Sequence, residues 1–362
     1  MLLGLPESLP ALVGKRFTAA RDSGHLVFSP TQLTTIQVGG IAYQLRYCPA
    51  LAKKPGAKPS SDGPKPDPFQ DPPPDLLVAE IPRAQPSHIL VLNKFPVIPN
   101  HFILATKEYK PQTDLLEKDD LAATFACLTA WNEQNNDDDG RPQRRLFAFF
   151  NSGQHSGASQ PHRHLQFLPV EDMQAQAAAP DSDPWVPLID QLSTSQAITT
   201  SAGYKQLPRL PFTHFALSIP RDPSAETLHE IYLSLYRAAV EAASASEPGD
   251  SSSLEGKEES NRTSGPAAIS YNLAMTISTM MICPRRRDHA RLGSIDAASN
   301  SATAQEAVDA GLVSLNGTIL AGTLMVKAEA EWNELRERPA SLDNILSTVG
   351  FPAQSSGAAN RL

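Results

Sequence analysis

The most informative segment of the chain reads Asn151-Ser-Gly-Gln-His-Ser-Gly-Ala-Ser-Gln-Pro-His-Arg-His-Leu-Gln-Phe-Leu168. It sets His162, His164 and Gln166 at every second position of an apolar run. On a β-strand this spacing points the three polar side chains to one face, and the intervening leucine and phenylalanine to the other. The preceding glycine and small hydroxyl residues can bring backbone N–H groups close to an anion. A candidate nucleophile and a candidate anion site therefore lie next to each other.

This spacing resembles the histidine triad superfamily, in which a strand carries His-x-His-x-His or His-x-His-x-Gln and the middle histidine attacks the α-phosphorus of a nucleotide. The glutamine form belongs to the nucleotidyltransferase branch. Residues 156–166 are similar to the fungal diadenosine tetraphosphate phosphorylases, also called ATP adenylyltransferases. A match over this whole stretch is far more specific than a bare His-x-His pair, and it implies that His164 is the nucleophile.

The resemblance extends from about residue 9 to residue 353. The similar segments are Leu9–Val13, Phe17, Ser23–Leu26, Leu92–Leu104, Ser270–Leu273, Thr276, Met280, Pro284–Arg285, Gly322, Val326–Lys327 and Val349–Pro352. The chain departs from the family at Thr279, where a tryptophan is common. The resemblance implies an N-terminal histidine-triad-like half with the catalytic motif, residues 1–205, and a C-terminal ATP adenylyltransferase half, residues 206–353, which together form one site.

The order of strands and helices lacks regular βαβ alternation and favours an α+β fold with an antiparallel sheet. Together with the resemblance, this predicts a histidine-triad-like sheet with flanking helices. Helical spacing predicts helices at Glu7–Asp22, from Asp119 onward, at Ser224–Ala243 and at Val326–Arg338. Alternating and β-branched residues predict strands within 26–47 and at Ile89–Asn93, His101–Thr106, Leu146–Phe150, Arg163–Leu168, Phe212–Ile219, Ile269–Met275, Thr279–Cys283 and Gly317–Leu320. Residues 49–75 are predicted to be a long loop and residues 244–266 a disordered insert.

Composition narrows the function classes. The chain has 362 residues, of which 41% are hydrophobic, so it can bury a core. A net charge of −8 argues against nucleic-acid binding through a basic surface. Three widely spaced cysteines indicate neither a disulfide framework nor a cysteine zinc site, and no apolar run approaches the length of a membrane span. We expect a monomeric protein in the cytoplasm, with the nucleus as a further location, and no nucleic-acid or membrane partner.

The three polar residues of the motif suit different roles. Neutral imidazole is nucleophilic, and a nucleotidyl-His164 intermediate would split one difficult transfer into two easier displacements. His162 is expected to orient the site or its partner loop by hydrogen bonding. Gln166 cannot titrate, but its amide N–H can donate to a non-bridging α-phosphate oxygen. Arg163 should point to the opposite face and be structural.

Further residues are candidates for substrate binding. Gly157, Ala158, Ser159 and Gln160 form the candidate phosphate cradle, for which a simple tight turn is the alternative. Asn151 is placed to bind ribose or phosphate, or to cap a turn. The resemblance alone implies the remaining substrate contacts, which are Lys54, Asn93, Lys94, Asn272, Leu273, Met280 and Arg285.

Metal binding is the rival use of the two histidines, because same-face histidines can ligate zinc. Further ligands are not obvious in the sequence. His155, His101 and Asp288 could be recruited, but their spacing from His162 and His164 is not that of a known metal motif. We therefore expect no protein-held metal and no tightly bound cofactor. Mg²⁺ or another divalent cation is expected at most as a companion of the polyphosphate substrate.

The resemblance implies reversible phosphorolysis of diadenosine tetraphosphate to ATP and ADP through an adenylyl-histidine, with a small nucleotide and phosphate as the partners. Two alternatives stay open. A hexose-phosphate uridylyltransferase would share the His-x-His-x-Gln logic, although the expected additional metal-ligand pairs are not found. A catalytically silent nucleotide-binding or interaction module would use the proline-rich loop and the insert to recruit partners.

Overall fold

The computed structural model describes residues 3–53, 66–132, 144–175, 185–246, 262–293 and 311–353. A ten-stranded sheet runs through its centre in the order β3-β4-β5-β7-β6-β11-β12-β10-β9-β8. The strands of this sheet are β3 (Leu77–Ile81), β4 (His88–Leu92), β5 (Phe102–Thr106), β6 (Leu146–Ser152), β7 (His164–Pro169), β8 (Ile198–Thr199), β9 (Lys205–Gln206), β10 (Phe215–Ser218), β11 (Tyr271–Met275) and β12 (Thr279–Pro284). Every neighbouring pair is antiparallel, so the predicted fold class is confirmed.

The two halves of the chain share this sheet. Strand β6 of the first half pairs with β11 of the second in continuous register, from Ser152 opposite Tyr271 to Ala148 opposite Met275. Strand β8 lies before residue 206 and β9 spans it. Both nevertheless extend the sheet beyond β10, which belongs to the second half. Strand β7, which carries His164 and Gln166, therefore lies next to β6 at the joint between the halves.

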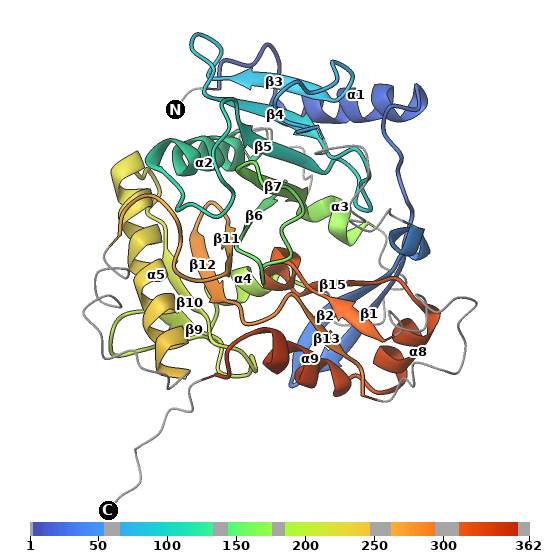
Figure 1. Cartoon of the computed structure of the whole chain (residues 1–362), viewed down its shortest axis with the longest axis vertical. Coiled ribbons are helices and arrows are strands. Elements are labelled where there is room, and N and C mark those ends of the chain that lie inside the picture. Colours follow the sequence, from blue (N-terminus) through green and yellow to red (C-terminus); the bar gives the residue numbers. More distant parts are fainter. Residues whose placement is uncertain are drawn as a thin grey trace, which may run out of the picture.

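Helices cover one face of the sheet (Figure 1). They are α1 (Leu9–Asp22), which packs on β3 and β4, α2 (Lys118–Asn132), which packs on β6, and α5 (Ala225–Ser246), which packs on β10 and β12. Helix α1 begins with a proline near its first position and buries Leu9, Leu12, Val13 and Phe17, as its periodicity predicts. No helix in the described ranges is both long and apolar enough to span a bilayer.

The other face carries a second core and a small sheet. Strands β1 (Gln32–Val38) and β2 (Ile41–Tyr47) form a hairpin, and β15 (Thr323–Val326) pairs with β2 in parallel. The N-terminal hairpin is therefore completed by the C-terminal half. The remaining elements are η1 (Pro49–Lys53), α3 (Val170–Gln174), α4 (Leu188–Gln191), β13 (His289–Arg291), β14 (Leu312–Ser314), η3 (Gly317–Ala321), α8 (Glu329–Glu337) and α9 (Ser341–Val349).

Three local predictions are corrected. Residues Gly317–Leu320 form the 3-10 turn η3, not a strand, because Asn316 caps its start and Gly322 ends it with a φ of 73°. The last helix of the prediction begins at Glu329, since Val326 still belongs to β15. The two ends of the predicted insert are ordered: α5 continues to Ser246, and Pro266 pairs with Asp114. Residues 247–261 of the insert lie outside the described residues.

Candidate active site

A row of polar side chains crosses the sheet face opposite α1, α2 and α5. Leu165 and Phe167 of β7 are buried in the helix-covered core. Because side chains alternate along a strand, His164 and Gln166 lie on the other face, as predicted. Across this face Gln166 stands opposite Phe149 of β6, and Asn151 of β6 stands opposite Asn272 of β11.

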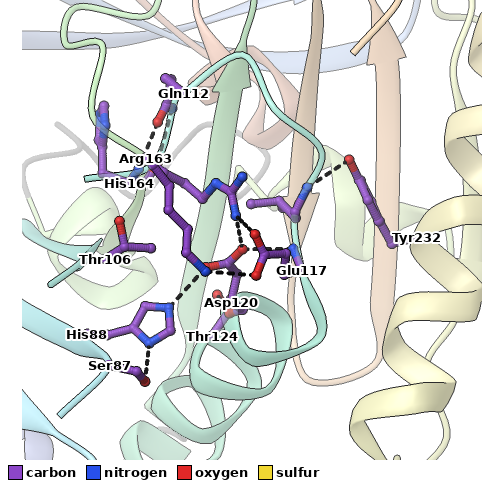
Figure 2. A network of polar contacts seen from close by, with 12 residues as sticks. Ser87, His88, Thr106, Gln112, Glu117, Asp120, Thr124, Arg163, His164 and Tyr232 are labelled. Carbon is purple, nitrogen blue, oxygen red and sulfur yellow. Dashed lines mark hydrogen bonds and ion pairs between the residues drawn. The ribbon is translucent and has the colours of Figure 1, made fainter. Parts of the chain in front are cut away.

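The backbone of His164 is held by the side chain of Gln112. The His164 N–H donates to Gln112 Oε1 at 2.7 Å, and Gln112 Nε2 donates to the carbonyls of His164 at 3.1 Å and Asn151 at 2.8 Å. Gln112 lies in the loop between β5 and α2, which also forms a bridge from Pro111 to His162. Figure 2 shows this amide beside the His164 backbone. Sequence reasoning missed Gln112, because nothing local marks it.

The ring of His164 is held by one of its nitrogens and leaves the other open. Its Nδ1 donates to the backbone carbonyl of His162 at 2.8 Å, which places the proton on Nδ1. The lone pair of Nε2 is therefore free, and Nε2 has no hydrogen-bond partner among the described residues. Burial lowers the pKa of His164 to about 4, so the imidazole is neutral at physiological pH.

His162 is held by protein on both sides of its ring. Its Nδ1 lies 2.7 Å from Asp67 Oδ2, its Nε2 lies 2.9 Å from Thr106 Oγ1, and the side chain is fully buried. The ring of Phe69 packs against both His162 and His164, with centroids 5.6 and 5.1 Å away. The ring of His162 is thus fixed by hydrogen bonds to Asp67 and Thr106. Asp67 and Phe69 lie in the proline-rich loop, which gave no sequence signal beyond its length.

Gln166 is linked to the β4–β5 hairpin. Its Oε1 accepts a hydrogen bond at 3.0 Å from His101 Nε2, and His101 Nδ1 lies 3.0 Å from Asn93 Nδ2. Gln166 Nε2 has no hydrogen-bond partner within the described ranges. The N–H groups of this amide therefore remain for a ligand.

Arg163 points to the opposite side of the strand, as its position predicts. Its guanidinium is buried and donates to Asp120 Oδ2 and Glu117 Oε1, both at 2.9 Å (Figure 2). His88 Nε2 lies 3.0 Å from the other oxygen of Asp120. Burial alone would raise the pKa of Asp120, but the His88 hydrogen bond and the Arg163 charge outweigh it, and the pKa is lowered. The network anchors the loop that carries Gln112.

The predicted cradle is a tight turn between β6 and β7. Gly157 has a φ of +78°, and a Cβ there would lie 2.8 Å from the carbonyl oxygen of Leu315. The Ser156 hydroxyl donates to the Gly153 carbonyl at 2.7 Å and closes the turn. Within cradle residues 157–160, the backbone N–H groups of Gly157, Ser159 and Gln160 have no partner among the described residues. The Ala158 N–H is already bonded to Ser156 Oγ at 3.3 Å. The cradle therefore offers three free backbone donors.

Asn151, Asn272 and Arg285 form a buried network behind the cradle. Arg285 Nη1 donates to Asn272 Oδ1, and Asn272 Nδ2 donates to Asn151 Oδ1 and to the Ser156 carbonyl, each at 2.9 Å. The Gly317 N–H also donates to Asn151 Oδ1 at 2.9 Å. Asn272 and Arg285 are thus committed to the protein. The Nδ2 of Asn151 has no partner in the described part of the chain and faces the same side of the sheet as His164.

Two predicted contact residues lie elsewhere. The side chains of Leu273 and Met280 are buried in the core on the helix-covered face of the sheet, so a substrate contact from either residue would have to come from its backbone. Strand alternation explains this position, because both neighbours of Leu273 on β11 point to the opposite side. Lys94 is exposed, with its ammonium 5.7 Å from the Phe95 ring centroid. Lys54 lies outside the described residues.

The rival metal ligands are not brought together. Among the described residues, no three His, Cys, Asp or Glu side chains lie where they could hold one metal ion. The two ring nitrogens of His162 face Asp67 and Thr106, and only Nε2 of His164 is open. The arrangement fits a single nucleophilic histidine flanked by amide donors.

Comparisons with known proteins find similarity over nearly the whole chain. A family model of the Ap4A phosphorylase N-terminal domain matches residues 2–183, and a model of the ATP adenylyltransferase C-terminal domain matches residues 208–352. Diadenosine 5',5'''-P1,P4-tetraphosphate phosphorylase 2 of Saccharomyces cerevisiae is 28% identical, and the match covers 96% of each chain. Protein APA1 of the same yeast is 26% identical over 98% of this chain and 97% of its own.

Solved structures show the same similarity in three dimensions. The crystal structure of yeast Ap4A phosphorylase Apa2 has a TM-score of 0.72 and 25% identity, covering 97% of this chain and 100% of its own. The complex of that enzyme with Ap4A has a TM-score of 0.71 with the same identity and coverage.

Proposed function

The chain belongs to the family of Ap4A phosphorylases and ATP adenylyltransferases, and we propose that it catalyses the reversible phosphorolysis of diadenosine tetraphosphate (Ap4A) to ATP and ADP. The observation that carries the proposal is the neutral His164, whose Nε2 lone pair lies on the same sheet face as the free amide donors of Gln166 and Asn151. A nucleophile beside anion-binding amides suits transfer of a nucleotidyl group.

The first step forms a covalent intermediate. His164 Nε2 attacks the α-phosphorus of one adenylyl group of Ap4A, a P–N bond forms, and the bond from this phosphorus to the bridging oxygen breaks. ATP leaves with that oxygen. The positive charge on the imidazolium is stabilised by the Nδ1–H bond to the His162 carbonyl, which keeps the ring orientation fixed during attack.

The second step returns the histidine. A phosphate oxygen attacks the same phosphorus, the P–N bond breaks, and ADP leaves while His164 becomes neutral again. Phosphate already carries negative charge and needs no general base, whereas an attacking water must lose a proton. Gln166 can donate a hydrogen bond but cannot accept that proton, so its amide favours transfer over hydrolysis.

The remaining ligands follow from this chemistry. We infer that the partners are the nucleotide and phosphate, and that a divalent cation enters with the polyphosphate, because Mg²⁺ commonly binds through substrate phosphates. We further propose that the protein acts as a monomer in the cytoplasm, with the nucleus as a further location. Its three cysteines, Cys48, Cys127 and Cys283, are unpaired and buried, which fits a reducing compartment.

Intact-protein mass spectrometry tests the proposal. The wild-type chain, incubated briefly with Ap4A in the absence of phosphate, should gain the mass of one adenylyl group and lose it again when phosphate is added, with release of ADP. His164→Ala should gain no mass. His25→Ala removes a half-exposed histidine that contacts Asp75 and none of the residues described above around His164, and it should react like the wild type.

The same experiment separates the alternatives. A uridylyl adduct from UDP-glucose, in place of an adenylyl adduct from Ap4A, would identify a uridylyltransferase. No adduct with either nucleotide, in protein that binds Ap4A, would identify a silent binding module. An adenylyl adduct that persists in His164→Ala would move the nucleophile to another residue.

A further inference from the structure

His101 connects the β4–β5 hairpin to the catalytic strand. It lies opposite Asn93 in the hairpin, where the Asn93 N–H donates to the His101 carbonyl at 3.0 Å. Its ring lies between the amides of Asn93 and Gln166, 3.0 Å from each, and only 7% of the side chain is exposed. No role follows for this residue from the adenylyl-transfer steps described above.

The hydrogen bonds in this chain of residues have a direction. The Phe95 N–H donates to Asn93 Oδ1 at 3.0 Å, which fixes which end of the Asn93 amide is oxygen. Asn93 Nδ2 must then face His101, so it donates to His101 Nδ1, and Nδ1 accepts. A neutral imidazole that accepts at Nδ1 carries its proton on Nε2. Nε2–H therefore donates to Gln166 Oε1, and the Gln166 Nε2 points away from His101.

We propose that His101 is a positioning residue that orients the Gln166 amide, so that its N–H group faces a non-bridging oxygen of the α-phosphate. The two ends of an amide have nearly the same size, so an unguided glutamine could equally present its oxygen. An amide oxygen would repel the phosphate oxygen as negative charge develops there, whereas the N–H stabilises it. The backbone N–H of Phe95 thus sets the polarity of a donor three side chains away. This inference rests on the proposed adenylyl transfer.

Two variants of His101 separate this role from simple packing. The amide nitrogen of a glutamine side chain reaches about the position of imidazole Nε2, whereas an asparagine reaches only that of Nδ1. His101→Gln therefore retains a donor for Gln166. His101→Asn retains a partner for Asn93 but has no donor that reaches Gln166. Gln166→Ala serves as the reference in which the proposed contact to phosphate is absent.

The readout is stereochemical. ADP with sulfur in place of one non-bridging α-oxygen exists as two diastereomers, and sulfur accepts hydrogen bonds weakly. Each diastereomer can adenylylate His164 in the reverse direction, with release of phosphate, and the rates follow from the mass of the thioadenylyl adduct. The wild type should prefer the diastereomer that keeps oxygen opposite the Gln166 N–H. Gln166→Ala should lose this preference and about a hundredfold in rate.

The expected result is that His101→Asn loses most of the diastereomer preference and about tenfold in rate with unmodified ADP, while His101→Gln recovers both. If His101→Asn does not fold, Asn93→Ala is measured in its place, because it keeps His101 but removes the donor that fixes its tautomer. If these variants kept the diastereomer preference of the wild type, whatever their reaction rate, the proposal would be overturned. A wild-type protein that forms no adduct at all would overturn the proposed function and this inference with it.

Discussion

The side-chain amide of Gln112 holds the backbone of His164 on both sides. Its oxygen accepts from the His164 N–H at 2.7 Å, and its nitrogen donates to the His164 carbonyl at 3.1 Å. The same nitrogen donates to the Asn151 carbonyl at 2.8 Å. The paired register of β6 and β7 runs only from Leu146 to Phe149 on β6. Gln112 therefore bridges the two strands beyond that point, where His164, the proposed nucleophile, lies.

Gln112→Ala should slow the formation of the adenylyl adduct about a hundredfold, because small displacements of a reacting group carry penalties of this size. It also leaves buried backbone groups of His164 and Asn151 without partners, at a cost of about 1–3 kcal/mol each in the free energy of unfolding. Rapid-quench mass spectrometry with Ap4A and urea unfolding measure the two effects. Gln37→Ala, on an exposed position of β1, is the control and should change neither. An unchanged adduct rate in Gln112→Ala would show that β7 alone fixes the nucleophile.

Local periodicity predicted much of this site. Alternation along β7 placed His164 and Gln166 on one face and Arg163 on the other, and the Arg163 side chain indeed binds Asp120 and Glu117 on the far side. This worked because the strand is buried on both faces, so that register decides every side-chain direction.

Residues that reach the site from distant segments could not be predicted in this way. Asp67 is 95 positions from His162, and Gln112 is 52 positions from His164. Neither contact has a period or a local motif, since tertiary folding alone creates it. The strand prediction at Gly317–Leu320 failed for another reason. Thr318 and Ile319 suit a strand, but the Asn316 cap and the left-handed Gly322 impose a 3-10 turn.

The adduct rate should depend on pH through His164. Burial lowers its pKa from 6.5 to about 4, and only the neutral ring is nucleophilic. The rate should therefore stay level as the pH falls from 8 to about 5, and decline only as the pH approaches 4. Ap4A has bridging phosphates alone, so it brings no phosphate ionisation into this range. Single-turnover mass spectrometry without phosphate measures the profile. A half-maximal rate near pH 6.5 would contradict a buried, neutral His164.

The free energy of unfolding should also depend on pH, and it has to be measured over the same range as the adduct rate. Burial also lowers the pKa of His214 to about 4. Between pH 6.5 and 4 the unfolded chain binds protons at His164 and His214 that the folded chain does not. The free energy of unfolding should thus fall as the pH falls through this window. Circular dichroism at each pH separates loss of structure from loss of the nucleophile.

Arg163→Met should destabilise the fold by about 3 kcal/mol, because it leaves the buried carboxylate of Asp120 without its guanidinium partner. Urea unfolding at pH 7 measures the change. Arg16→Met is the matched control, since Arg16 is exposed on α1 and forms no ion pair in the described part of the chain. It should alter stability by less than about 0.5 kcal/mol. Equal effects of the two substitutions would show that the network contributes nothing to stability.

Gly157→Ala should disturb the cradle beyond the strain of its backbone. Gly157 and Gly203 have φ angles of +78° and +86°, and alanine in this region costs about 1–2 kcal/mol at either position. A Cβ at 157 also meets the Leu315 carbonyl oxygen at 2.8 Å, whereas one at 203 meets nothing within 4 Å. Only Gly157→Ala should therefore raise KM for Ap4A, while both should lower Tm. An equal change of KM in both variants would show that the cradle does not bind the substrate.

Asp67→Asn should invert the hydrogen bonding of His162. The Asp67 carboxylate can only accept, so His162 Nδ1 carries a proton toward it at 2.7 Å. An asparagine can turn its NH₂ toward Nδ1, in which case the proton moves to Nε2 and is donated to Thr106 Oγ1. Because the His162 carbonyl accepts from His164 Nδ1, any shift of this residue displaces the nucleophile, and the adduct rate should fall about tenfold. Nitrogen-15 chemical shifts of the histidine rings report the tautomer, and Asp71→Asn, an exposed change in the same loop, is the control. If the tautomer stayed as in the wild type while the rate fell, Asp67 would act through its charge on His164. That charge raises the pKa of His164, although the larger effect of burial lowers it.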